Sequence, residues 1–247
     1  MVQMSKMSSD KMYHNTSCQQ HSYLSNDHSH LIDGKEEVEL ESSKVLTIQM
    51  DIFDEINMSN NICIVQQCNS IRRKAHGFSL SIIKKLGDYG DVYSRRSGAT
   101  ANTASLYDRP ECGTIEWSDP PIFGKKLPYI EHLFAQFDSG LPLESNRISL
   151  THKHLIHDEH FQRNKRQDTK GKRLEYFRSC LSKLASNLNN EACPIDRICF
   201  PHGIGCASAG GDWLSYERAI REFEKKITQS VVIAKLPSKC NTTASKQ

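Results

Sequence analysis

The sequence predicts an α/β protein, a sandwich of three layers (α/β/α) around a mixed sheet. Runs of apolar, β-branched residues alternate along the chain with segments whose apolar residues recur at helical spacing. The run Ile-Cys-Ile-Val at residues 62–65 is apolar throughout, which is typical of a central strand covered on both faces. We expect this domain to cover residues 43–236, between disordered polar tails at residues 1–42 and 237–247.

Length and composition limit the class of protein. The 247 residues suffice for one sizeable domain plus tails, and a net charge of +3 is too small to indicate nucleic-acid binding by itself. No apolar run of about 18 residues is present, so we expect no membrane span. The first ten residues lack the apolar segment of a secretory signal, and we therefore expect a cytoplasmic or nuclear protein. The nine cysteines form no C-x-x-C pair, which argues against a zinc ribbon or thioredoxin chemistry.

Strands and helices follow from the hydrophobic pattern. The predicted strands are residues 44–52, 62–65, 113–117, 129–137, 198–200 and 230–236. The predicted helices are residues 77–86, 170–187 and 212–227. Residues 138–168 are interpreted as a long polar insertion that connects the strand 129–137 to the helix 170–187.

The most informative stretch is the glycine loop, residues 202–211, between the strand 198–200 and the helix 212–227. Four of the nine residues 203–211 are glycine, and glycine reaches positive φ at little cost. Exposed backbone amides and the following helix N-terminus suit an anion, most often a phosphate. The alternative is a tight strand-to-helix connection without a ligand.

Two familiar phosphate loops fit this stretch poorly. The ATPase-type loop ends in Gly-Lys-Ser/Thr, whereas this loop ends in Gly-Gly-Asp-Trp and offers no lysine. The dinucleotide fingerprint G-x-G-x-x-G matches Gly203 and Gly205, but Ser208 stands where the third glycine belongs. A different kind of nucleotide site is therefore expected.

Two other polar segments follow strand ends, namely Asp51-Ile52 and Gln67-Cys68-Asn69. Ligands of α/β sheets bind outside the carboxyl ends of the strands. We therefore expect these two segments and the glycine loop to meet at one crevice.

Together these segments resemble the macro domain, and specifically its ADP-ribose 1″-phosphate phosphatase-like branch. Asp51-Ile52 is similar to the family's first-strand Gly-Asp-Ile, and Val-Gln-Gln-Cys-Asn at residues 65–69 to its strand-end asparagine loop. Gly77-Phe78-Ser79 resembles the turn that opens the next helix. Residues 201–213 resemble the family's Ile-Gly-Cys-Gly-Leu-Ala-Gly-Gly-Asp-Trp, with Ala-Ser in place of Gly-Leu. The resemblance covers about residues 44–236.

The resemblance implies ADP-ribose in the crevice, with a role for each matching residue. Asp51 would accept a hydrogen bond from the adenine amino group, with Ile52 beside the ring. Asn69 would bind hydroxyls of the distal ribose, and the loop at His76 and Gly77 would close over it. The residues implied to hold the diphosphate are Gly203, Ile204, Gly205, Cys206, Ala207, Ser208, Ala209, Gly210 and Gly211. The implied partner is ADP-ribose or an ADP-ribosylated protein, for a monomer without cofactor, metal or membrane.

Each of these residues also has a purely structural interpretation. Asp51 could be a surface carboxylate at a strand end, and Asn69 could be a turn residue that bonds its own backbone. Asp212 could cap the helix that follows it, with its carboxylate accepting amide hydrogens of the first turn.

Catalysis is a separate hypothesis. Removal of a 1″-phosphate or of a protein-linked ADP-ribosyl group needs an activated water or a nucleophile near the distal ribose. The candidates are His76 and Asp212, with Cys206 and His202 as further possibilities. The alternative is a non-catalytic reader of ADP-ribose.

Two charged features support other interpretations. The basic stretches 72–74 and 163–172 would suit a module that binds RNA or poly(ADP-ribose) without hydrolysis. A pure interaction scaffold is a third class. The histidines His152, His154, His157 and His160 could bind zinc, but the neighbouring lysines and arginines favour a solvated insertion.

Overall fold

The structure is a computed structural model that describes residues 44–55, 61–121, 127–142, 155 and 157–237. The predicted tails, residues 1–42 and 237–247, lie outside the described residues except for residue 237. No helix in the described ranges is long and apolar enough to cross a membrane.

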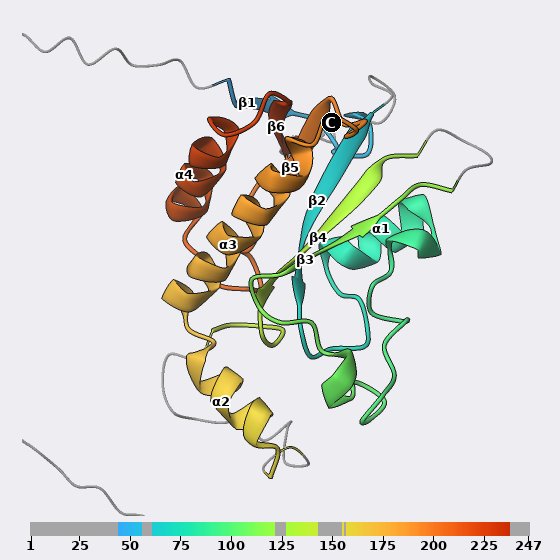
Figure 1. Cartoon of the computed structure of the whole chain (residues 1–247), viewed down its shortest axis with the longest axis vertical. Helices are drawn as coiled ribbons and strands as arrows, with labels where there is room; N and C mark the ends of the chain where they lie inside the picture. The colour runs from blue at the N-terminus through green and yellow to red at the C-terminus, as the bar shows by residue number, and fades with distance from the viewer. Residues whose placement is uncertain (1–43, 56–60, 122–126, 143–154, 156, 238–247) are drawn as a thin grey trace, which may run out of the picture. The chain divides into compact units, whose positions relative to one another are not determined.

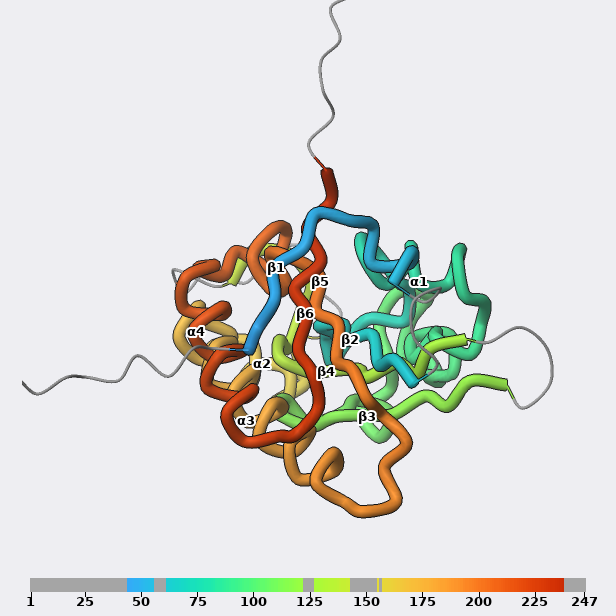
Figure 2. The backbone as a smooth tube through the Cα atoms, turned by 90° about the horizontal axis from the view of Figure 1, so that it is seen from above, coloured from blue at the N-terminus to red at the C-terminus, as the bar shows by residue number. Residues whose placement is uncertain are grey.

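Six strands form one mixed sheet in the order β1-β6-β5-β2-β4-β3 (Figures 1 and 2). All neighbouring strands are parallel except β3 and β4, which are antiparallel. The carboxyl ends of the five parallel strands therefore meet at one edge. The strands are β1 (Leu46–Gln49), β2 (Ile62–Asn69), β3 (Ile115–Ser118), β4 (Tyr129–Gln136), β5 (Arg197–Pro201) and β6 (Ser230–Lys235).

Helices cover both faces of the sheet. Figure 2 shows α1 (Phe78–Leu86) on one side, and α3 (Lys170–Leu188) and α4 (Trp213–Glu224) on the other. The predicted three-layer α/β/α sandwich with a mixed sheet is thus confirmed. Within residues 138–168, expected to be a polar connection, lies the further helix α2 (Glu159–Gln167).

One aromatic residue anchors α2. Phe161 is fully buried and packs against Phe137, Leu155 and Ile71, while the Asp158 carboxylate caps the helix through the amide of Phe161 at 2.8 Å. A single buried apolar position leaves almost no periodic signal in a charged segment. The sequence pattern therefore did not reveal this helix.

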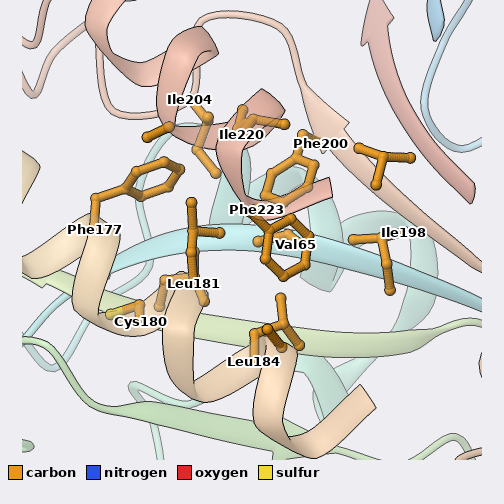
Figure 3. Close-up of a cluster of buried hydrophobic side chains, with 14 of the residues drawn as sticks. Val65, Phe177, Cys180, Leu181, Leu184, Ile198, Phe200, Ile204, Ile220 and Phe223 are labelled. Carbon is orange, nitrogen blue, oxygen red and sulfur yellow. The ribbon is translucent and has the colours of Figure 1, made fainter. Parts of the chain in front are cut away.

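The larger core lies between the sheet and the pair α3 and α4 (Figure 3). Phe177, Leu181 and Leu184 of α3 pack against strand residues such as Val65 and Phe200. Burial of such side chains contributes roughly 1.5–3 kcal/mol each. This packing fixes both the direction of β5 and the start of α4, and so the two ends of the glycine loop.

An acidic residue is buried in β4 without a partner. Glu131 is 0% exposed, and neither carboxylate oxygen has a hydrogen-bond partner among the described residues. Burial, and secondarily the charge of Glu116, raises the pKa of Glu131 to about 9. The neighbouring His132 is also buried, which lowers its pKa to about 3. Both side chains are therefore neutral at pH 7.

These two shifts predict how the free energy of unfolding changes with pH. Between pH 6.5 and 9, Glu131 is protonated in the folded state and ionised in the unfolded chain. The free energy of unfolding therefore falls as the pH rises, by at most about 1.4 kcal/mol per pH unit. Between about pH 3 and 6.5 the unfolded chain binds a proton on His132 that the fold excludes, so stability rises with pH. From pH 4.5 to 6.5 the two effects oppose each other.

Glu131→Gln is expected to raise the melting temperature more at pH 8.5 than at pH 6.5, because the amide has no proton to lose. Thermal unfolding monitored by circular dichroism across this range measures the effect. The matched control is Glu191→Gln at an exposed position, which should keep the wild-type pH dependence. An unchanged slope in Glu131→Gln would contradict the assignment.

Candidate functional site

A cavity of about 660 Å³ opens at the carboxyl edge of the parallel strands. It is bounded by the ends of β2, β4, β5 and β6, the turn after β1, the start of α1 and the glycine loop. Of the residues expected at the site, those lining it are Asp51, Ile52, Asn69, His76, Gly77, His202, Gly203, Ile204, Gly205, Cys206, Ala207, Ser208 and Ala209. Gly210, Gly211 and Asp212 are not among its lining residues.

The glycine loop presents unbonded amides to this cavity. Its turns are closed by bonds such as Cys206 N to Gly203 O (2.9 Å) and Gly211 N to Gly205 O (2.9 Å). Among the described residues, no partner exists for the N–H groups of Gly203, Gly205, Ala207, Ser208 and Ala209. Successive unbonded N–H groups on a concave surface form an anion site. The loop can thus hold an anion with main-chain atoms alone.

Gly205 places this loop directly on the sheet and α4. Its φ of +72° is in the left-handed region. A Cβ there would lie 2.5 Å from Gln67 Oε1 and closer still to the ring of Tyr216. Gly203, with φ +76°, has open space around the same position. Glycine is therefore required at 205 by packing as well as by backbone conformation.

A fully buried arginine fixes the loop from behind. Arg173 forms a bidentate pair with Asp168, through Nε at 2.8 Å and Nη2 at 2.6 Å. Its Nη1 donates to the carbonyls of Gly140 (2.7 Å) and Ala209 (2.8 Å), which belong to two segments of the cavity wall. The sequence did carry a signal for this residue, since Arg173 lies one turn before Phe177 on the buried face of α3.

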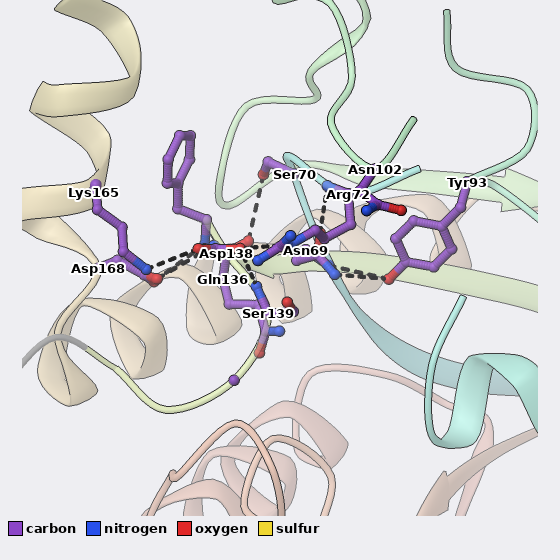
Figure 4. A network of polar contacts seen from close by, with 12 residues as sticks. Asn69, Ser70, Arg72, Tyr93, Asn102, Gln136, Asp138, Ser139, Lys165 and Asp168 are labelled. Atoms are coloured by element: carbon purple, nitrogen blue, oxygen red, sulfur yellow. Dashed lines mark hydrogen bonds and ion pairs between the residues drawn. The ribbon is translucent and has the colours of Figure 1, made fainter. Parts of the chain in front are cut away.

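Asn69 has the turn role that was left open as its alternative. Its Oδ1 accepts from the Arg72 amide at 2.8 Å, and its backbone N–H donates to the Tyr93 hydroxyl at 3.3 Å (Figure 4). Arg72 Nε donates to Asp138, which also accepts from Lys165 Nζ. Asn69 nevertheless lines the cavity, and its Nδ2 group is what it can offer to a ligand.

The opposite end of the cavity has apolar walls. Asp51 is half-buried and its Oδ1 accepts from the Phe53 amide at 3.1 Å, which turns the chain after β1. Ile52 is buried, and the rings of Phe53 and Phe78 stack at 6.0 Å. All of these residues line the cavity. The two phenylalanines lie 25 positions apart in the sequence, and although Phe78 belongs to the Gly77-Phe78-Ser79 turn, no motif paired it with Phe53.

The two catalytic candidates are in different environments. Asp212 caps α4, its Oδ2 accepting from Ser215 N (2.9 Å) and Ser215 Oγ (2.7 Å), which lowers its pKa. The capping interpretation is confirmed. His76 is exposed and lines the cavity.

Burial raises the pKa of Cys206 to about 11, so this residue is a neutral thiol at physiological pH and a poor nucleophile.

No group of three or more metal-ligating side chains occurs in the described part of the chain. His157 precedes α2 and His160 lies within it, where the His160 ring contacts Phe137 at 6.2 Å. His152 and His154 lie outside the described residues.

No protein-family model matches the sequence. No curated protein matches it either. Solved structures with a similar backbone include the DarG macrodomains of Mycobacterium tuberculosis (TM-score 0.48) and Thermus aquaticus (TM-score 0.49). Each is 13% identical in sequence, and each match covers 78% of this chain and 98% of the other chain. A Bacteroides thetaiotaomicron protein of unknown function is 20% identical over 79% of this chain and 99% of that chain, with a TM-score of 0.47. At these identities and TM-scores the likeness supports no conclusion about function. The function is therefore argued from the cavity.

Proposed function

We propose that the protein binds ADP-ribose or an ADP-ribosyl group in this cavity. The observation that carries the proposal is the set of unbonded amides in the glycine loop, with Asp51 and apolar side chains on one side of it and the polar side chains at the ends of β2 and β4 on the other. The lining also includes Lys85 and Lys235. The diphosphate would lie on the unbonded amides of Gly203, Gly205, Ala207, Ser208 and Ala209. Adenine would lie between Ile52 and the phenylalanine pair, its amino group donating to Asp51, and the distal ribose would lie beside Asn69.

Size and chemistry agree with such a ligand. The volume of about 660 Å³ lies within the range of small-molecule sites, roughly 300–1,000 Å³. An ionised carboxylate accepts hydrogen bonds, and a backbone amide donates them. Asp51 therefore suits an exocyclic amino group, and the amides of the glycine loop suit a phosphate. Base stacking on aromatic rings contributes about 1–3 kcal/mol.

Calorimetry with ADP-ribose tests this proposal. We expect a dissociation constant in the micromolar range, about −8 kcal/mol. Asp51→Ala should weaken binding about tenfold, because a hydrogen bond to a charged group contributes about 1.5–3 kcal/mol. Asn69→Ala should also weaken binding. The control is Asp54→Ala, an exposed neighbour that does not line the cavity.

The same variants distinguish ADP-ribose binding from the RNA-binding alternative. Absence of ADP-ribose binding by the wild type would contradict the proposal. Salt-sensitive binding of RNA that Asp51→Ala leaves unchanged would favour a basic surface instead. Part of that surface is already engaged, since Arg73 donates to the carbonyls of Arg96 (2.8 Å) and Thr100 (3.3 Å).

For hydrolysis, we propose His76 as the acid–base group. Asp51 is the one carboxylate among the described lining residues and lies at the apolar end. Two imidazoles, His76 and His202, also line the cavity, and His76 belongs to the loop expected to close over the distal ribose, so we propose it as the proton acceptor there. Phosphate release from ADP-ribose 1″-phosphate by wild type and His76→Gln tests this role. Intact binding without release would identify a reader.

A further inference from the structure

Tyr93 is a buried cavity residue that no sequence motif singled out. It lies in the irregular segment between α1 and β3, and it is 3% exposed. Its ring packs with Cys68 and Phe134 at the ends of β2 and β4. It lines the same cavity as Asn69, on the polar side.

The phenol is held rigidly against the Asn69 loop. The Tyr93 amide donates to Asp91 Oδ1 at 2.8 Å, which fixes its backbone. The Arg96 guanidinium lies 4.8 Å from the centre of the Tyr93 ring. The Nη1 group of Arg96 also donates to the carbonyls of Asn69 (3.0 Å) and Arg72 (2.7 Å). One buried cation thus sets the position of the phenol relative to the loop, before any ligand binds.

The hydrogen bonds at this end leave one strong donor unused. The Tyr93 oxygen accepts from the Asn69 amide at 3.3 Å and, more weakly, from Asn69 Nδ2 at 3.5 Å. The Asn69 Oδ1 atom is already occupied by the Arg72 amide. In the described structure no oxygen accepts the phenolic proton, and the group that interacts with it is the thiol of Cys68, a weak acceptor. Burial raises the pKa of Tyr93, so the phenol keeps its proton at physiological pH.

The charges nearby argue for a neutral ligand group. The guanidinium of Arg72 pairs with Asp138, and those of Arg73 and Arg96 donate to backbone carbonyls. The donors at this end of the cavity include the Asn69 amide and the Tyr93 phenol, and Gln136 and Ser139 also line it. Neutral donors of this kind suit a hydroxyl or ring oxygen of a sugar better than a second phosphate, which would gain most from a cation.

We propose that Tyr93 is the specificity-determining donor for the distal sugar, and that its hydroxyl distinguishes a diphosphate carrying a pentose from one carrying none. The inference rests on the proposed binding of ADP-ribose. It identifies which part of the ligand each end of the cavity recognises. The preferred ligand class is a nucleoside diphosphate with a neutral polyhydroxylated group on its β-phosphate.

The test is Tyr93→Phe, which removes the hydroxyl and keeps the ring. By calorimetry we expect about tenfold weaker binding of ADP-ribose and unchanged binding of ADP, since ADP has no group at this end. The matched control is Tyr89→Phe. That variant loses a phenolic bond of the same kind, to the Pro128 carbonyl at 2.8 Å, outside the cavity. It should leave both affinities unchanged.

Three other outcomes are distinguishable. Equal weakening of ADP-ribose and ADP would show that Tyr93 acts through the shape of the whole cavity, which overturns the inference. Unchanged binding of both ligands by Tyr93→Phe would also overturn it, while leaving the proposed function intact. If the wild type binds ADP but gains nothing from the ribose, the proposed function and the inference are both wrong.

Discussion

Replacement of Arg173 by methionine is expected to lower the free energy of unfolding by about 3–5 kcal/mol. The substitution leaves the carboxylate of Asp168, which is 0% exposed, without its cation. It also removes the donors to the Gly140 carbonyl, a part-buried bond of 2.7 Å, and to the Ala209 carbonyl, a buried bond of 2.8 Å. Urea unfolding of the purified variant measures the loss.

The control is Arg178→Met on the exposed face of the same helix, which should change stability by less than about 0.5 kcal/mol. The double variant Arg173→Met with Asp168→Leu should recover part of the loss, because replacing a buried pair is less costly than breaking it. A single variant as stable as Arg178→Met would contradict the central role of this ion pair.

Gly205→Ala is expected to abolish ADP-ribose binding at millimolar ligand. The left-handed φ of +72° costs an alanine about 1–2 kcal/mol. The added methyl group also overlaps Tyr216 and Gln67, so the loop must move away from α4 and β2. The unbonded amides of the loop would then be displaced from their positions in the cavity wall. Calorimetry and thermal unfolding should be measured on the same preparation.

Gly203→Ala separates the two causes. It has almost the same φ, +76°, but open space around its added methyl group. We expect Gly203→Ala to lower the free energy of unfolding only by the cost of the left-handed φ. If both variants had the same melting temperature, the packing of Gly205 on Tyr216 would not be what positions the loop.

The strand predictions succeeded where one face or both faces of a strand are apolar. Residues 62–65 were predicted and belong to β2, but β2 continues to Asn69 through polar residues. Gln66 lies buried in that extension because its Nε2 contacts His132 Nδ1 of β4 at 2.6 Å. Such a partner is 66 positions away, so composition alone placed the strand end too early.

For the candidate site, the rule that ligands bind at strand ends led to Asp51, Asn69 and the glycine loop. These three do line one cavity. Arg173 and Tyr93 were missed, because each acts on a segment far from it in sequence. The bond from Arg173 to Ala209 spans 36 positions, and that from Asn69 to Tyr93 spans 24.

By itself the sequence determined what depends on near neighbours in the chain. These features are the periodic helices, the buried strands, the cap at Asp212 and a loop with glycines where positive φ is needed. The tertiary structure decided which amides remain unbonded, which arginine supports the loop and which phenol lines the cavity. Those properties depend on atoms that only folding brings within hydrogen-bonding distance.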